Sequence, residues 1–183
     1  MHAQSHYQLG QFLIRAYLPD KPRRYHLAFL TGCLEPDRNP ITYLKGSIRC
    51  QWFRGHHWPN SHRYMQRIAR RLESKAKLRL LDYYTLGKLI HYTADAFTFA
   101  HNKGFSAGLK QHRSYERVLN AHFLRHLQQG SIRLPGSSHS VMDLIHTHHR
   151  LYSSHPGTLQ QDCDYAAGVC AKILEQLTIG RAV

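Results

Sequence analysis

Histidine and carboxylate side chains recur four residues apart in two neighbouring segments of this sequence. His91 and Asp95 lie in the apolar run LGKLIHYTADAFTFAH, which ends at His101, and His112 and Glu116 follow shortly after it. Residues four apart share one face of a helix, with Cβ atoms about 6 Å apart, so each pair can share one metal ion. His101 is out of phase with Asp95 on a straight helix, so it suits a neighbouring ion.

Each pair alone also fits a simpler interpretation, a core histidine that is hydrogen-bonded to a carboxylate one turn away. Two such pairs on successive helices are harder to explain by packing, because antiparallel helices bring facing pairs together around a core metal site. Imidazole nitrogen and carboxylate oxygen suit zinc, and a mixed set with open positions suits catalytic zinc.

Further candidate ligands lie upstream of these pairs. Asp37 follows Pro36, and His56 and His57 stand together in the segment RGHHWPNSH. His6 lies among apolar residues near the start of the chain, where a histidine is also ordinary in a helical core.

The sequence pattern predicts helices for all the elements that position these residues. Helical periodicity predicts one all-α domain, residues 1–183, built as a bundle of about seven helices. We expect helices at about 5–18, 23–34, 60–77, 78–102, 108–129, 140–153 and 158–178. Pro36 is expected to end the second helix, and residues 36–58 are expected to be irregular.

Charge and composition narrow the class of partner. The chain has 25 Lys and Arg residues against 11 Asp and Glu residues, for a net charge of +14. This charge favours phosphates, nucleic acid or an acidic membrane surface, although a protein that is merely basic would show it equally. Part of it lies on the helix expected at 60–77, where four arginines share one face: Arg63, Arg67, Arg70 and Arg71.

The sequence also favours some locations and sites over others. Its first residues do not resemble a signal peptide, and no apolar run approaches the roughly 20 residues that a membrane-spanning helix needs. We therefore expect a cytoplasmic protein. The four cysteines form no CxxC pair, so a zinc–thiolate site is not expected.

The chain resembles the zinc-dependent phospholipase C family, whose fold is shared with the S1/P1-type nucleases. The run LGKLIHYTADAFTFAH fits a family helix pattern close to LGxxxHYxxDxxxPxH, with Phe99 where a proline is usual. Four other segments match the family in the same order: Ser5-His6, Gly32 to Asp37, His56 with Trp58 after it, and His112 with Glu116. The resemblance covers about residues 5–120.

The resemblance implies two or three zinc ions (Zn²⁺). One would be held by Asp37, His56, His91 and Asp95, and a second by His101, His112 and Glu116. A third, in the family, uses the early histidine, here His6, a bridging contact from Asp95, and the amine of the mature N-terminus. That amine is not matched, because Met1 stands five residues before His6. His57 competes with His56 as the ligand.

Clustered zinc ions suit the hydrolysis of phosphodiesters. We expect a zinc-bound hydroxide to attack phosphorus, with Asp37 as a zinc ligand and as the candidate acceptor of the water's proton. Three functions stay open: a phospholipase C-like hydrolase acting on phospholipid head groups or related phosphodiesters, an S1/P1-like nuclease favoured by the positive charge, and a non-catalytic metal-binding helical protein. The sequence predicts no oligomeric state.

Overall fold

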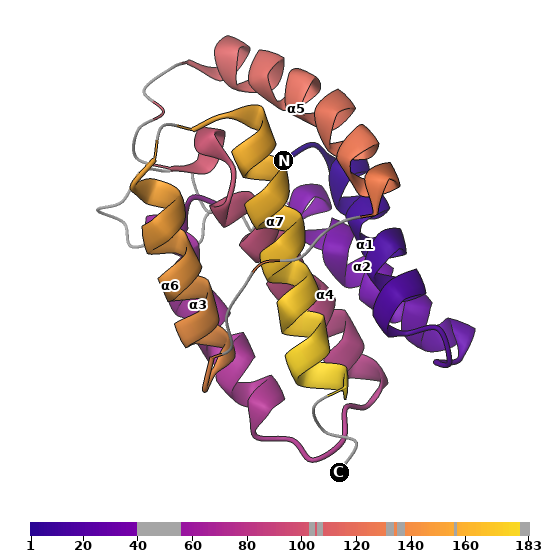
Figure 1. The fold of residues 1–183 in the computed structure, drawn as a ribbon. Coiled ribbons are helices and arrows are strands. Elements are labelled where there is room, and N and C mark those ends of the chain that lie inside the picture. The colour runs from indigo at the N-terminus through magenta and orange to yellow at the C-terminus, as the bar shows by residue number, and fades with distance from the viewer. Residues whose placement is uncertain are drawn as a thin grey trace.

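The structure is a computed structural model, and it describes residues 1–39, 56–102, 105, 108–130, 134, 138–155 and 157–179. These residues form seven α-helices and no β-strand, which confirms the predicted all-α class (Figure 1). The helices are α1 (Ala3–Tyr17), α2 (Arg23–Arg38), α3 (Trp58–Glu73), α4 (Leu80–Ala96), α5 (Leu109–Gln129), α6 (Val141–Ser153) and α7 (Leu159–Leu174). Two shorter elements follow α4 and α7: the 3₁₀ turn η2 (Phe99–His101) and the π-helical turn η3 (Glu175–Ile179).

Helix α4 lies at the centre of the bundle. It packs against α2, α3 and α7, and Figure 1 shows α1 and α2 on one side of it, α3 and α6 on the other, and α5 across one end. Every residue at 89–98 is buried. A helix that is buried on all sides belongs to the core. His91 and Asp95 lie in this part of α4, and both are completely buried from solvent.

Helices α2 and α4 approach each other closely at two facing glycines. A Cβ atom on Gly32 or on Gly87 would collide with the backbone of the other helix. This packing accounts for a wrong prediction, because α2 does not end at Pro36 but continues to Arg38 with the proline inside it. Tertiary contacts of α2 outweigh the roughly 3 kcal/mol cost of an interior proline. The added turn carries Asp37 to the side of α4.

Several helix ends follow their predicted signals, whereas α3 ends at Glu73 and α4 at Ala96, short of the predicted 77 and 102. The hydroxyl oxygens of Ser140 and Thr158 accept the N–H groups that cap α6 and α7, and α5 ends at Gly130, whose φ of 73° is left-handed. Helix α3 begins at Trp58, two residues before the predicted start, because Pro59 suits the first helical turn. The predicted irregular stretch at 36–58 falls largely on residues 40–55, outside the described residues.

Within the described part of the chain, no helix combines the length and apolar character that crossing a membrane requires. The three described cysteines, Cys33, Cys163 and Cys170, are buried and free, as small core residues would be.

Candidate metal centre

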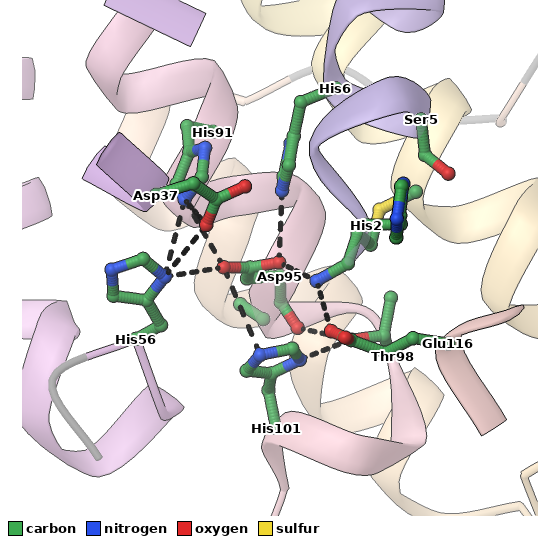
Figure 2. Close-up of polar contacts among 12 residues, drawn as sticks. His2, Ser5, His6, Asp37, His56, His91, Asp95, Thr98, His101 and Glu116 are labelled. Carbon is green, nitrogen blue, oxygen red and sulfur yellow. Dashed lines mark hydrogen bonds and ion pairs between the residues drawn. The ribbon is translucent and has the colours of Figure 1, made fainter. Parts of the chain in front are cut away.

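The carboxylate of Asp95 is the centre of a buried polar cluster (Figure 2). Its Oδ1 atom lies 3.2 Å from His6 Nε2. Its Oδ2 atom lies 3.1 Å from His56 Nδ1, 3.3 Å from His91 Nε2 and 3.9 Å from His101 Nε2. The side chain is completely buried, and a charge in such a place costs several kcal/mol unless it is paired. The histidines therefore surround a buried negative charge that needs a positive partner.

Asp37 joins this cluster from the last turn of α2. Its Oδ1 atom lies 3.7 Å from His56 Nδ1 and 3.6 Å from His91 Nε2, and these two ring nitrogens are 3.3 Å apart. The His91 Nδ1–H group donates to the Cys33 carbonyl oxygen, at 2.8 Å. In a neutral ring this contact leaves the Nε2 lone pair facing the two carboxylates. Such a lone pair is repelled by the carboxylates unless a metal ion stands between them or the ring binds a proton. Burial lowers the pKa of His91, but Asp95 outweighs it and raises the pKa above its ordinary value.

The structure distinguishes the two adjacent histidine candidates. His56 is buried and contacts Asp37 and Asp95. His57 is half-buried at the N-cap of α3, with its ring centroid 5.5 Å from that of His101. His56 is thus the one that lies within the cluster.

The end of α4 brings His101 back towards Asp95, contrary to the expectation for a straight helix. Helix α4 stops at Ala96, and the 3₁₀ turn η2 follows at Phe99–His101. The Thr98 hydroxyl donates to the Asp95 carbonyl oxygen, at 2.8 Å, and lies 2.8 Å from His101 Nδ1. Because a hydroxyl has one proton to give, the ring Nδ1–H must donate to it, and Nε2 of His101 stays free to bind a cation.

A second group of candidate ligands forms between η2 and α5. His112 Nε2 lies 3.3 Å from Glu116 Oε1, and the His112 ring meets the His101 ring edge-on at 5.1 Å. These three residues each offer a ligand atom, and the atoms lie within 4.8 Å of one another. The structure thus brings together the predicted second set.

The start of the chain enters the cluster through Met1 and His6. The Met1 α-amine contacts Asp95 Oδ1 and lies 3.2 Å from Glu116 Oε1. The sequence does not predict this contact, because Met1 stands five residues before His6. The His6 ring stacks on that of His91, with centroids 3.9 Å apart. Neither ring nitrogen of His6 has a hydrogen-bond partner within the described residues.

Burial and charge shift the ionisation of this cluster. Burial lowers the pKa of His6 to about 4 and holds the pKa of His101 well below its usual range. Burial opposes ionisation of Asp95, but His101 and the α-amine outweigh it and hold the Asp95 pKa well below its ordinary value. The amine is buried too, yet Asp95 and Glu116 raise its pKa to about 10.

The donor set fits divalent metal ions, and zinc best. Three groups in the described residues have ligand atoms within 4.8 Å of one another: His6, His91 and Asp95; Asp37, His56 and His91; and His101, His112 and Glu116. Neutral imidazole and carboxylate are ligands that zinc prefers. A cation on His6 Nε2 would satisfy one of the two buried ring nitrogens that lack hydrogen bonds, since buried polar atoms normally have a partner.

Fold and cluster together define an all-α protein with a buried histidine–carboxylate centre of the kind that holds several metal ions. The zinc-dependent phospholipase C family model matches residues 5–161, so the chain belongs to that family, as the sequence predicts. No curated protein and no solved structure matches the chain.

Proposed function

We propose that this protein is a zinc-dependent phosphodiesterase of the phospholipase C type, which cleaves a phospholipid head group or a related phosphodiester. The observation that carries the proposal is the gathering of three ligand groups around the buried carboxylate of Asp95, in a member of the zinc-dependent phospholipase C family. Two of the groups share His91, and the third contains His101, whose Nε2 atom lies 3.9 Å from Asp95 Oδ2. We assign the ligands as follows: Asp37, His56, His91 and Asp95 to one ion; His101, His112 and Glu116 to a second; His6, Asp95 and the Met1 amine to a third.

When bound, clustered zinc ions stabilise charge on phosphoryl oxygens and acidify water. The chain's own carboxylates then divide the remaining work according to their exposure. The Asp95 side chain is completely buried, so it can only bind metal ions and orient the histidine rings. The Asp37 side chain, in contrast, is 16% exposed. Asp37 is therefore our candidate for the acceptor of the attacking water's proton. The Cys33 carbonyl oxygen keeps the His91 ring in the tautomer that a ligand needs.

A nuclease is the second candidate, and the exposed face of α3 favours it. Arg63, Arg67 and Arg70 are exposed along this helix and span about 10 Å at 1.5 Å per residue. The helix starts at Trp58, two residues after the cluster residue His56. A nucleic-acid backbone bound along these arginines would therefore lead towards the metal centre.

Hydrolysis assays with and without a chelator separate the candidates. The substrates are phosphatidylcholine, an aryl phosphodiester and single-stranded DNA, and zinc content is measured on the same samples. We expect chelator-sensitive hydrolysis of phosphatidylcholine and the aryl phosphodiester. Hydrolysis of DNA alone would favour the nuclease, and stoichiometric zinc without any hydrolysis would favour a non-catalytic protein. A chain without zinc would overturn the proposal.

One variant and a matched control test the role of Asp37 as proton acceptor. Asp37→Asn keeps an oxygen ligand but removes the proton acceptor, so we expect hydrolysis to fall by at least about 100-fold. Asp20→Asn changes an exposed carboxylate on the α1–α2 connection and should leave hydrolysis unchanged. Wild-type activity in Asp37→Asn would remove Asp37 from the mechanism.

A further inference from the structure

A second buried carboxylate, Asp162 on α7, ties together three other elements. Its Oδ2 atom accepts the Phe99 backbone N–H, at 3.0 Å, and the Tyr115 hydroxyl. Its Oδ1 atom accepts the Tyr152 hydroxyl, at 2.6 Å. The residue is completely buried, and it lies just beyond the segment that the family model matches. None of the proposed ligand sets includes it.

Two of these donors belong to the segments that carry the second ligand group. Phe99 opens η2, which ends at the candidate ligand His101. Tyr115 stands next to Glu116 in α5. One oxygen atom therefore connects the two segments whose separation sets the second group. The third donor, Tyr152, lies on α6, which contributes no assigned ligand.

Phe99 is also the residue at which the chain departs from the family pattern. The preceding residue, Thr98, has φ −124° and ψ 136°, a conformation that residues before proline adopt. The backbone here thus suits a proline, but proline has no N–H to donate. The hydrogen bond to Asp162 exists only because residue 99 is not a proline.

We propose that Asp162 is a positioning residue for the group His101, His112 and Glu116, and that its carboxylate holds η2 against α5. The inference rests on the proposed function, because it assumes that this group binds zinc. Partners that orient metal ligands from behind typically change metal affinity about 10–100-fold when they are removed.

Two matched pairs of variants test the anchor in the full-length chain. Phe99→Pro removes the N–H and keeps the backbone conformation, whereas Phe99→Ala keeps the N–H and removes the ring. Tyr115→Phe and Tyr152→Phe each remove one hydroxyl from the same carboxylate, but only the Tyr115 helix carries ligands. Zinc is titrated into the metal-free proteins by calorimetry, and Co²⁺ spectra report the geometry of each bound ion.

We expect Phe99→Pro and Tyr115→Phe to weaken one zinc-binding step about 10–100-fold and to alter one Co²⁺ spectrum. Phe99→Ala and Tyr152→Phe should stay close to the unaltered chain in both measurements. Asp162→Ala should behave like Phe99→Pro, and Asp162→Asn, which keeps an oxygen for the Phe99 N–H, should recover part of the affinity. If Asp162→Ala does not fold, the two matched pairs at Phe99 and at the tyrosines still test whether Asp162 positions the zinc ligands.

Two different results would overturn the inference. If the unaltered chain binds zinc, and Phe99→Pro and Tyr115→Phe bind it equally well at every step, the positioning role of Asp162 is wrong while the proposed function stands. An equal weakening by Tyr152→Phe would make the effect one of general stability and would also remove the role. If the unaltered chain binds no zinc, the proposed function fails, and the inference fails with it.

Discussion

Replacing Asp95 by asparagine is the sharpest test of the metal centre. The change keeps the shape of the side chain and removes the charge that His6, His56, His91 and His101 approach within 3.9 Å. In the metal-free protein it leaves the buried Met1 amine without its nearest partner. Breaking a buried pair in this way costs about 3–5 kcal/mol.

Asp95→Asn should lower the stability of the zinc-loaded protein more than that of the metal-free protein. A bound ion at a free concentration of 100 times its Kd stabilises the folded chain by about 2.7 kcal/mol. Two of the three assigned ions use Asp95, so their loss removes about 5 kcal/mol. A chain of this size changes its Tm by about 2–4 °C per kcal/mol. We therefore expect Asp95→Asn to lower the Tm of the loaded protein by a further 10–20 °C or so.

Zinc content by mass spectrometry and thermal unfolding with and without chelator measure these effects. Asp82→Asn is the matched control, because Asp82 is equally buried on α4 and pairs with Lys75. The control should lose stability but keep its zinc and its response to chelator. The metal centre would be refuted by an Asp95→Asn protein with full zinc and the wild-type response to chelator.

Four further outcomes are expected. A glycine added before Met1 should displace the α-amine from Asp95 and lower the zinc content by one ion, as measured by mass spectrometry. Gly87→Ala forces α4 away from α2, so denaturant unfolding should show a loss of about 1–3 kcal/mol. Arg67→Ala should reduce the salt dependence of single-stranded DNA binding by about 0.7 in log–log slope, followed by fluorescence anisotropy; an unchanged slope would count against the nuclease. Burial raises the pKa of Asp162 to about 7 from 3.8. This carboxyl therefore binds its proton more tightly when folded, and it contributes stability below its ordinary pKa that is lost as the pH rises to about 7. The unfolding free energy of the metal-free protein should fall over this range, and Asp162→Asn should flatten the fall.

The features that the sequence predicts well depend on short-range geometry. His91 with Asp95, and His112 with Glu116, lie four residues apart, and helical repeat alone brings each pair together. The caps at Ser140 and Thr158 are local in the same sense. Their hydroxyl groups need only a neighbouring N–H, so the starts of α6 and α7 follow from the sequence.

The features that the sequence did not predict depend on tertiary packing. Pro36 stays inside α2 because the glycine contact holds that helix against α4. The Met1 amine reaches Asp95 only because α1 docks beside α4, which no pattern near residue 1 encodes. Asp162 is one of two aspartates in a helix of ordinary composition, and its role depends on donors from three other elements.

Charge balance in the cluster sets the smallest number of zinc ions that the proposed reaction needs. With neutral imidazoles, Asp37, Asp95 and Glu116 contribute −3 and the Met1 ammonium +1, so the cluster carries −2 and would repel a phosphodiester. One zinc ion only neutralises it, whereas two give +2, and three with a deprotonated amine give +3. A centre that must attract an anionic substrate therefore needs at least two ions. The protein's surplus of 14 positive charges can bring the substrate to the surface, but it cannot replace the second ion at the reacting phosphorus.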